Sequence, residues 1–146
     1  MIFYSYDEFS KDVEVMAKEL KGYGCDTIVA IARGGMTLGH FLAEHMSIRN
    51  LYSLNSIHYD NQQKLEYIKV YNIPDLSKAK KVVIVDDIID SGETMHEITR
   101  LLQERYPTVE FKNAAIFYKP TSIIKPDFAV KEAKGWIEFF WSKATN

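Results

Sequence analysis

Three carboxylates follow an apolar run in the middle of the chain. Val82–Val85 leads directly into Asp86 and Asp87, and Asp90 comes three residues later. Carboxylates at the end of a buried strand can accept hydrogen bonds from the vicinal hydroxyls of a sugar, or they can hold Mg²⁺ directly or through water. These residues therefore predict a site for a hydroxyl-bearing ligand or a hard cation.

The run that continues from the third aspartate has the composition of an anion-binding helix start. Asp90–Thr94 reads DSGET and turns into a segment with helical spacing, Thr94–Tyr106. A helix N-terminus presents free backbone N–H groups and the positive end of the helix dipole, so it attracts anions. Gly92 lets the backbone come close, and Ser91 and Thr94 add hydroxyl donors. Carboxylates and loop together could hold a phosphorylated sugar.

Two other interpretations of the same run are open at this point. The run is compatible with an ordinary capped helix after a buried strand, in which Asp86 and Asp87 are simply solvated. It is also compatible with a Walker-B strand. That strand requires a GxxxxGK[ST] loop elsewhere in the chain, and the sequence contains none.

A second loop of unusual composition follows an earlier strand pattern. Thr27–Ala32 (TIVAIA) is a short β-branched apolar run, typical of a buried strand, and Arg33, Gly34 and Gly35 follow at once. A guanidinium offers paired donors to phosphate oxygens. The glycines admit backbone conformations that are closed to other residues. Taken alone, this loop could equally be a tight turn with an exposed arginine.

The elements that must position these loops alternate between helix and strand patterns. Ser5 and Glu8 have capping-box spacing before a helical run of apolar residues. Strands are expected at Leu51–Tyr59 and Val109–Lys119, and a helix at Met36–Met46. This order predicts an α/β fold with a mostly parallel central sheet flanked by helices. Ligands bind outside the carboxyl ends of such strands, so both loops would face one crevice if their strands are neighbours.

Length and composition narrow the class of protein. The chain has 146 residues, 47% apolar and 26% charged, which indicates one globular domain. A net charge of −2 argues against a general nucleic-acid binder. The N-terminus lacks a signal-peptide pattern, no apolar run approaches the roughly 20 residues of a membrane helix, and Cys25 is the single cysteine. We expect a cytoplasmic protein without integral membrane association.

The four histidines carry no metal-site spacing. His40, His45, His58 and His96 do not form an HxxxH pair, and none has the neighbouring cysteine or acid pattern of a zinc site. The sequence therefore favours structural or surface roles for all of them.

As a whole pattern, VVIVDDIIDSGET resembles the PRPP-binding signature of type I phosphoribosyltransferases. ARGG resembles the pyrophosphate loop of the same fold, and YDNQQKLEYIKV resembles its mobile loop. FYKP and WIEFFW resemble the purine-binding end of the bacterial xanthine-guanine and hypoxanthine phosphoribosyltransferases. The likeness runs from about Ile28 to Trp141 and implies one domain over residues 1–146. Within that domain it implies a core over about 1–118 and a small C-terminal hood over about 119–146.

The resemblance implies transfer of a 5-phosphoribosyl group from PRPP to a 6-oxopurine, with release of pyrophosphate and a requirement for Mg²⁺. Asp86 and Asp87 would bind the ribose hydroxyls, with Asp87 closer to the metal. Arg33 and Gly34 would bind pyrophosphate, and the peptide after Arg33 is often strained or cis in this fold. The 5′-phosphate would be held by the loop residues Asp90, Ser91, Gly92, Glu93 and Thr94.

The purine side of the implied site comes from the end of the chain. Lys119 would donate to the C6 carbonyl, and it would select against adenine, which presents an amino group there. Trp136 would stack on the base, and Ile137 would contact the 2-position edge through its backbone carbonyl. Asp90 would be the base near purine N7. Discrimination among guanine, xanthine and hypoxanthine is not predicted.

The match is weaker in the loop from Asp60 to Lys69, whose closure would exclude water from the reaction. Relatives place a basic residue after the Asn-Gln pair, whereas this chain has Gln63 and then Lys64. Lys64 or Lys69 would contact pyrophosphate, and we favour Lys64. Glu93 also departs from the small or basic residue often found in the phosphate loop, and an outward side chain would accommodate it.

A second class of function is compatible with the same fold. The chain could sense PRPP or a nucleotide without catalysis and regulate through nucleic acid, because a fold does not fix a function. Such regulators usually carry an added DNA-binding domain or a basic face, and this sequence shows neither. We therefore expect small-molecule substrates, no nucleic-acid partner, and a homo-oligomer, either dimer or tetramer, as in relatives.

Overall fold

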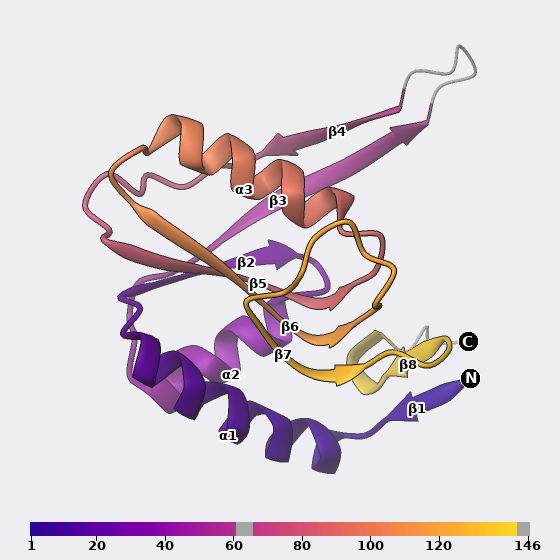
Figure 1. The fold of residues 1–146 in the computed structure, drawn as a ribbon. Helices are drawn as coiled ribbons and strands as arrows, with labels where there is room; N and C mark the ends of the chain where they lie inside the picture. The colour runs from indigo at the N-terminus through magenta and orange to yellow at the C-terminus, as the bar shows by residue number, and fades with distance from the viewer. Residues whose placement is uncertain (61–65, 143–146) are drawn as a thin grey trace.

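A six-stranded sheet forms the centre of the computed structural model, which describes residues 1–60 and 66–142. Its strand order is β4-β3-β2-β5-β6-β7, and a separate two-stranded sheet pairs β1 with β8 (Figure 1). The strands are β1 Ile2–Tyr4, β2 Thr27–Ala32, β3 Leu51–Asp60, β4 Glu66–Tyr71, β5 Lys81–Ile89, β6 Glu110–Tyr118, β7 Phe128–Glu132 and β8 Ile137–Phe139. The helices are α1 Tyr6–Tyr23, α2 Met36–Met46 and α3 Glu93–Arg105, and a 3₁₀ turn spans Phe140–Ser142.

The central sheet is parallel except at one edge. Five strands run parallel to one another, namely β3, β2, β5, β6 and β7. The edge strand β4 is antiparallel to β3. The central strands β2, β5 and β6 consist mostly of buried residues because helices cover both faces. α1 and α2 lie on one face and α3 lies on the other (Figure 1). The expected α/β fold with a mostly parallel sheet is confirmed.

Two hydrophobic clusters fill the space on the two faces of the sheet. On the face of α1 and α2, Phe9, Val13 and Leu20 pack with buried side chains of the strands. On the other face, Ile98 and Leu102 of α3 pack with a second buried set. Burial of each of these side chains stabilises the fold by roughly 1.5–3 kcal/mol. The helices are therefore fixed against the sheet, and so are the loops that precede α2 and α3.

The structure differs from the sequence expectations at four places. The expected loop from Asp60 to Lys69 is wrong at both ends, because Asp60 belongs to β3 and Glu66–Lys69 belongs to β4. β5 continues to Ile89, so Asp86 and Asp87 lie inside the strand rather than after it. The predicted helix Thr94–Tyr106 begins and ends one residue earlier, at Glu93 and Arg105. Neither β7 nor the pairing of β1 with β8 was expected. β7 lies in the range proposed for the hood and yet extends the main sheet, and the division at residue 118 stays a prediction.

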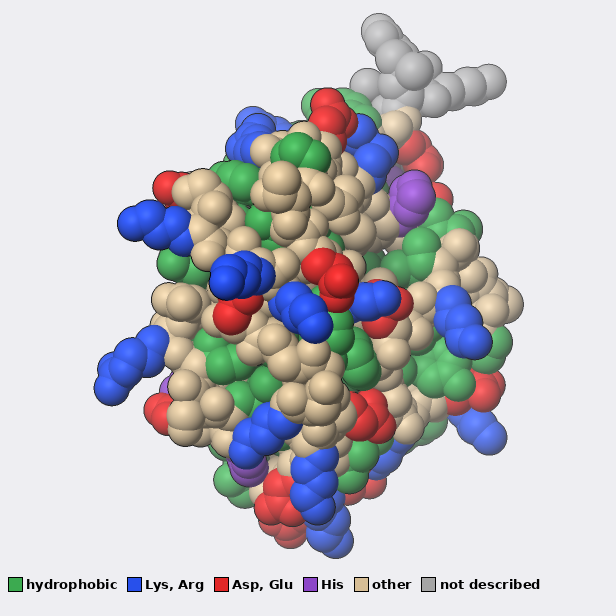
Figure 2. Space-filling model, turned by 60° about the vertical axis from the view of Figure 1, so that its left-hand side comes forward, with side chains coloured by type: hydrophobic (Ala, Val, Ile, Leu, Met, Phe, Trp, Pro, Cys, Tyr) green, Lys and Arg blue, Asp and Glu red, His purple; other side chains and the backbone are tan. Residues whose placement is uncertain are grey.

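Charges of both signs are distributed over the surface. On the face in Figure 2, lysine and arginine side chains stand among aspartates and glutamates. No helix of the described residues combines the length and apolarity that crossing a membrane requires.

Candidate functional site

The two unusual loops lie at the same edge of the sheet, because their strands are neighbours. β2 pairs with β5 in parallel, with Thr27 opposite Val82 and Ala30 opposite Val85. The loop after β2 therefore stands beside the last residues of β5. The expected meeting of the two loops is confirmed.

The loop after β2 lies directly against the aspartate pair. A Cβ added to Gly34 would lie 2.6 Å from Oδ2 and 2.8 Å from Oδ1 of Asp87. A Cβ on Gly35 would collide with the carbonyl of Val85 and lie 3.1 Å from Cα of Asp86. Gly34 thus lies against the carboxylate of Asp87, and Gly35 lies so close to the backbone of β5 that a side chain has no room there.

The peptide geometry beside the exposed Arg33 differs from the implied one. A cis peptide bond joins Ala32 to Arg33, one bond before the position that the resemblance suggested. Arg33 makes no ion pair with another residue of the described ranges. Its guanidinium is thus available at the rim of the site.

The two adjacent aspartates are half-buried, and each accepts a hydrogen bond from the backbone N–H of the residue that follows it. The N–H of Asp87 donates to Oδ1 of Asp86 at 2.8 Å, and the N–H of Ile88 donates to Oδ1 of Asp87 at 2.7 Å. Burial raises the pKa of Asp86 well above its ordinary value, and the neighbouring Asp87 carboxylate raises it further. Burial also raises the pKa of Asp87, although hydrogen bonds to its carboxylate oppose the shift. A cation or a set of hydroxyl donors would offset this cost.

The conformation of the loop at the start of α3 depends on Gly92 and on contacts with the connection between β6 and β7. Gly92 adopts the left-handed conformation at φ 87°, and an added Cβ would collide with Oγ of Ser122. The N–H of Ile123 donates to the carbonyl of Ser91 at 2.8 Å, and the N–H of Glu93 donates to Oγ of Ser91 at 3.2 Å. Ser122 and Ile123 had no local sequence signal, because they reach the loop from the connection between β6 and β7.

A small pocket of about 100 Å³ lies at this loop. Its lining includes Asp86, Asp90, Ser91, Gly92 and Thr94. Most of the residues assigned to ribose and phosphate on the resemblance are therefore brought together around one hollow.

Lys119 and Asp90 form an ion pair at the same edge. Nζ of Lys119 lies 3.0 Å from Oδ1 of Asp90, and both side chains are well exposed. The backbone N–H of Lys119 also donates to the carbonyl of Ile89 at 2.9 Å, because β6 runs beside β5. The predicted base and the predicted purine donor, 29 residues apart in the sequence, are thus direct neighbours.

Trp136 and Ile137 lie on the small sheet formed by the two ends of the chain. The Trp136 side chain is 75% exposed, whereas Ile137 is buried. The N–H of Ile2 donates to the carbonyl of Trp136 at 2.8 Å, in a parallel register that places Ile2 opposite Ile137. In a parallel ladder this register directs the backbone groups of Ile137 away from β1. In the described ranges, Trp136 forms no ring stack, so its aromatic face is open.

The two lysines that were candidates for binding pyrophosphate, Lys64 and Lys69, have different outcomes. Lys64 lies outside the described residues. Lys69 is exposed on β4, opposite Ile57 on β3, and its Nζ lies 5.8 Å from the ring centre of Tyr71 on the same strand. The choice between the two lysines stays a prediction.

Comparisons with known proteins agree with this geometry. Residues 5–144 match the model of the phosphoribosyl transferase domain family. The xanthine-guanine phosphoribosyltransferase of Cereibacter sphaeroides is 30% identical over 96% of this chain and 86% of its own. The corresponding enzyme of Ruegeria is also 30% identical, over 96% of this chain and 84% of its own.

Solved structures give the same result. The Helicobacter pylori xanthine-guanine-hypoxanthine phosphoribosyltransferase superposes with a TM-score of 0.90 at 36% identity, covering 96% of this chain and 92% of that one. A purine phosphoribosyltransferase of Pyrococcus horikoshii superposes with a TM-score of 0.87 at 26% identity, over 99% and 96% of the two chains. The resemblance inferred from the sequence is confirmed, and the chain belongs to the phosphoribosyltransferase family.

Proposed function

We propose that this chain transfers the 5-phosphoribosyl group of PRPP to a 6-oxopurine, in purine salvage. The observation that carries the proposal is the pairing of Lys119 with Asp90 at 3.0 Å. A 6-oxopurine protonated at N7 presents a carbonyl acceptor and an N–H donor side by side on one edge. An ammonium donor beside a carboxylate acceptor complements that edge. Adenine presents an amino donor instead of the carbonyl, so it would leave Lys119 without an acceptor.

The phosphoribosyl end of the substrate fits the other residues of the same edge. The backbone N–H groups at the start of α3 and the hydroxyls of Ser91 and Thr94 would hold the 5′-phosphate. Asp86 and Asp87 would accept hydrogen bonds from the ribose hydroxyls. Arg33 and the backbone of Gly34 would bind the pyrophosphate group.

The aspartate pair also fits a hard divalent cation. Two half-buried carboxylates with raised pKa values lie side by side, and a cation would offset both their burial and their mutual repulsion. Asp87 would be the closer ligand. When bound, Mg²⁺ would supply positive charge to the departing pyrophosphate.

The transfer itself exchanges one bond for another at ribose C1. The bond from C1 to the pyrophosphate oxygen breaks, and its electron pair leaves with the pyrophosphate. A bond forms between C1 and a purine nitrogen, and Asp90 accepts the proton that the purine releases. Arg33 and one of the two lysines, Lys64 or Lys69, would stabilise the negative charge on the departing pyrophosphate. Trp136 would stack on the base, and the outward carbonyl of Ile137 would contact its 2-position edge.

The test is a substrate panel. The purified chain is mixed with PRPP, Mg²⁺ and one of guanine, xanthine, hypoxanthine or adenine, and nucleotide formation is followed. Turnover with at least one 6-oxopurine and little with adenine is expected. Binding of PRPP without turnover on any 6-oxopurine would overturn the proposal in favour of a sensor without catalysis.

We also expect the protein to be a cytoplasmic homo-oligomer, as the family resemblance implies. Met36 on α2 and Tyr52 on β3 are exposed apolar side chains that line one surface depression and would suit a contact between subunits. Light scattering coupled to size exclusion would distinguish a dimer or tetramer from a monomer.

A further inference from the structure

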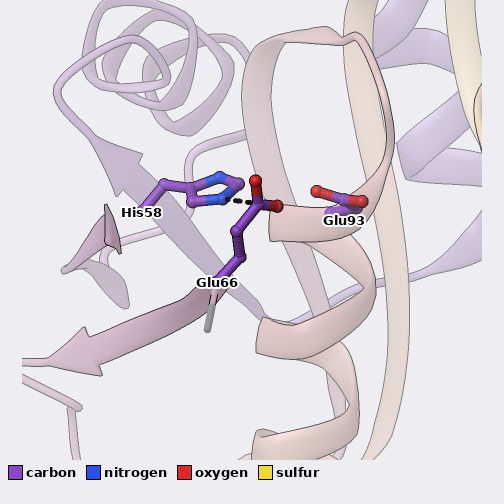
Figure 3. Close-up of side chains that lie close together, drawn as sticks. All are labelled: His58, Glu66 and Glu93. Carbon is purple, nitrogen blue, oxygen red and sulfur yellow. Dashed lines mark ion pairs between the residues drawn. The ribbon is translucent and has the colours of Figure 1, made fainter. Parts of the chain in front are cut away.

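A second group of ligand-type side chains lies between the β3–β4 hairpin and the start of α3. His58 of β3, Glu66 of β4 and Glu93 of α3 each offer one ligand atom, and these atoms all lie within 4.8 Å of one another. Figure 3 shows the three side chains meeting from three separate elements. Nε2 of His58 is 3.6 Å from Oε2 of Glu66.

We propose that His58, Glu66 and Glu93 bind a divalent cation of the zinc class, at a site beside the proposed phosphate loop and distinct from the aspartate pair. One imidazole and two carboxylates are a donor set that suits Zn²⁺, whereas Mg²⁺ takes oxygen ligands. Two ligand atoms about 2.1 Å from a tetrahedral Zn²⁺ stand roughly 3.4 Å apart. The separation of 3.6 Å between His58 and Glu66 is already close to that value.

The third ligand reaches the same geometry by small rotations. All three side chains are exposed, so their rotamers are not fixed by packing. Because the ligand atoms lie within 4.8 Å of one another, closure by at most about 1.4 Å brings them to tetrahedral spacing. The cation would also relieve the repulsion between the carboxylates of Glu66 and Glu93.

The surroundings provide space and further donors. His96, one helical turn after Glu93, lines the same pocket of about 410 Å³, together with Glu97. The pocket has room for water in the remaining coordination position or for a fourth protein ligand. No sequence pattern indicated this set, because its three members are brought together by the sheet edge and the helix.

A bound cation would join the hairpin to the helix whose start is proposed to hold phosphate. The backbone N–H of Glu93 donates to Oγ of Ser91 in the proposed phosphate loop, and its side chain belongs to the cluster. Binding of the cation to the folded chain would stabilise the position of β4 relative to α3.

The experiment titrates the full chain with Zn²⁺, by calorimetry and by equilibrium dialysis, in a buffer with excess Mg²⁺ that occupies oxygen-only sites. One Zn²⁺ per chain is expected. Substitution of residues that only support the metal ligands already lowers metal affinity by about tenfold or more. Removal of a ligand itself, in His58→Ala or Glu93→Gln, should therefore weaken Zn²⁺ binding at least tenfold. Amide hydrogen exchange in β4 should slow when Zn²⁺ is added to the wild-type chain.

Matched variants separate this site from others. His45→Ala removes an exposed histidine of α2, and Glu104→Gln removes an exposed carboxylate of α3 far from the cluster, so both should bind Zn²⁺ as the wild type does. Equal affinity in His58→Ala and the wild type would overturn the proposal. Loss of Zn²⁺ binding in Asp87→Asn with retention in His58→Ala would also overturn it, because the ion would then lie at the aspartate pair.

Discussion

The region at the start of α1 and the region from the end of β5 to the start of α3 carry the same kinds of polar residue. Among the described residues, their hydrogen-bonding groups are paired within the protein in the first region and are mostly left without such partners in the second. At α1, Oγ of Ser5 accepts the N–H of Glu8 at 3.2 Å, and Oε2 of Glu8 accepts the N–H of Ser5 at 3.0 Å. The N-terminus of this helix is therefore capped by Ser5 and Glu8 themselves. α3 instead follows Gly92, which is in the left-handed conformation and has no side chain to cap the helix, and within the described ranges only the N–H of Glu93 is accepted by a neighbouring hydroxyl, that of Ser91.

The carboxylates of the two regions differ in the same way. Asp12 of α1 is buried, but it accepts the hydroxyl of Tyr4 at 2.5 Å and lies 3.1 Å from Nζ of Lys131. Asp86 and Asp87 have no cationic partner in the described part of the chain. Polar groups that serve the fold are paired inside the protein, whereas those at the end of β5 are left for a ligand.

The largest expected effect is that of Asp90→Asn. If Asp90 accepts the purine proton, turnover should fall by about 10²–10⁴-fold, while the KM for PRPP changes little. Steady-state kinetics with the preferred 6-oxopurine would measure both. A turnover near that of the wild type would show that the base assignment is wrong.

Gly92→Ala should come next. The left-handed backbone costs an alanine about 1–2 kcal/mol, and its Cβ would displace Ser122. A shift of about an ångström in the loop should lower kcat/KM about 100-fold. Gly22→Ala is the matched control, since nothing lies within 4 Å of its added Cβ, and it should leave the kinetics unchanged. Wild-type kinetics in Gly92→Ala, as in Gly22→Ala, would show that the loop Asp90–Thr94 is not part of the substrate site.

Lys119→Ala should raise the KM for the purine by about tenfold to 100-fold, because a hydrogen bond from a charged donor to the C6 carbonyl is lost. The KM for PRPP should change much less. Discrimination against adenine should weaken in the same variant. Comparing guanine and adenine kinetics in both proteins would reveal whether Lys119 reads the base or only pairs with Asp90.

Asp86→Asn should stabilise the ligand-free protein, in contrast to Asp12→Asn. The pKa of Asp86 is raised in the folded state, so its ionisation costs stability as pH rises through that pKa. The asparagine variant avoids this cost, so its stabilising effect should be present above the folded pKa and should vanish below about pH 4, the range of the unfolded pKa. Asp12→Asn should instead lose about 1–3 kcal/mol with its partners.

Urea unfolding of both aspartate variants between pH 4 and pH 8, without Mg²⁺ or PRPP, would measure these differences. Destabilisation by Asp86→Asn at neutral pH would mean that its charge is satisfied within the fold. The contrast between the two carboxylates would then be wrong.

The smallest effect is expected at Ser5. Ser5→Ala removes the side-chain cap of α1 and should lower the free energy of unfolding by about 1 kcal/mol. Its kinetic constants should equal those of the wild type, because this helix start is closed by its own residues. A change in KM for PRPP would contradict the comparison.

Local patterns in the sequence predicted much of the fold and the frame of the site. Ser5 and Glu8 form the expected capping box, and the strand Thr27–Ala32 lies where expected, because both depend on neighbours in sequence. The meeting of the Arg33 and Asp90 loops followed from general rules of parallel sheets. The assignment of PRPP and purine to particular residues came from the family resemblance.

Contacts between distant segments could not be predicted in this way. The three-residue strands β1 and β8 are too short for a periodic signal, and each is defined only by the other. The same holds for Ser122 beneath Gly92 and for Glu93 beside His58. Asp86 and Asp87 were placed after their strand because carboxylates seldom lie within a buried one.

The pairing of β1 with β8 also has a consequence for the order of assembly. Ile2 holds the carbonyl of Trp136, so the element proposed to receive the base is attached to the first residues of the chain. Closing so long a loop is entropically costly before its contacts form, and such pairings form late in folding. During synthesis, the phosphoribosyl half of the site can therefore form on β2 and β5 before β8 is available to pair with β1.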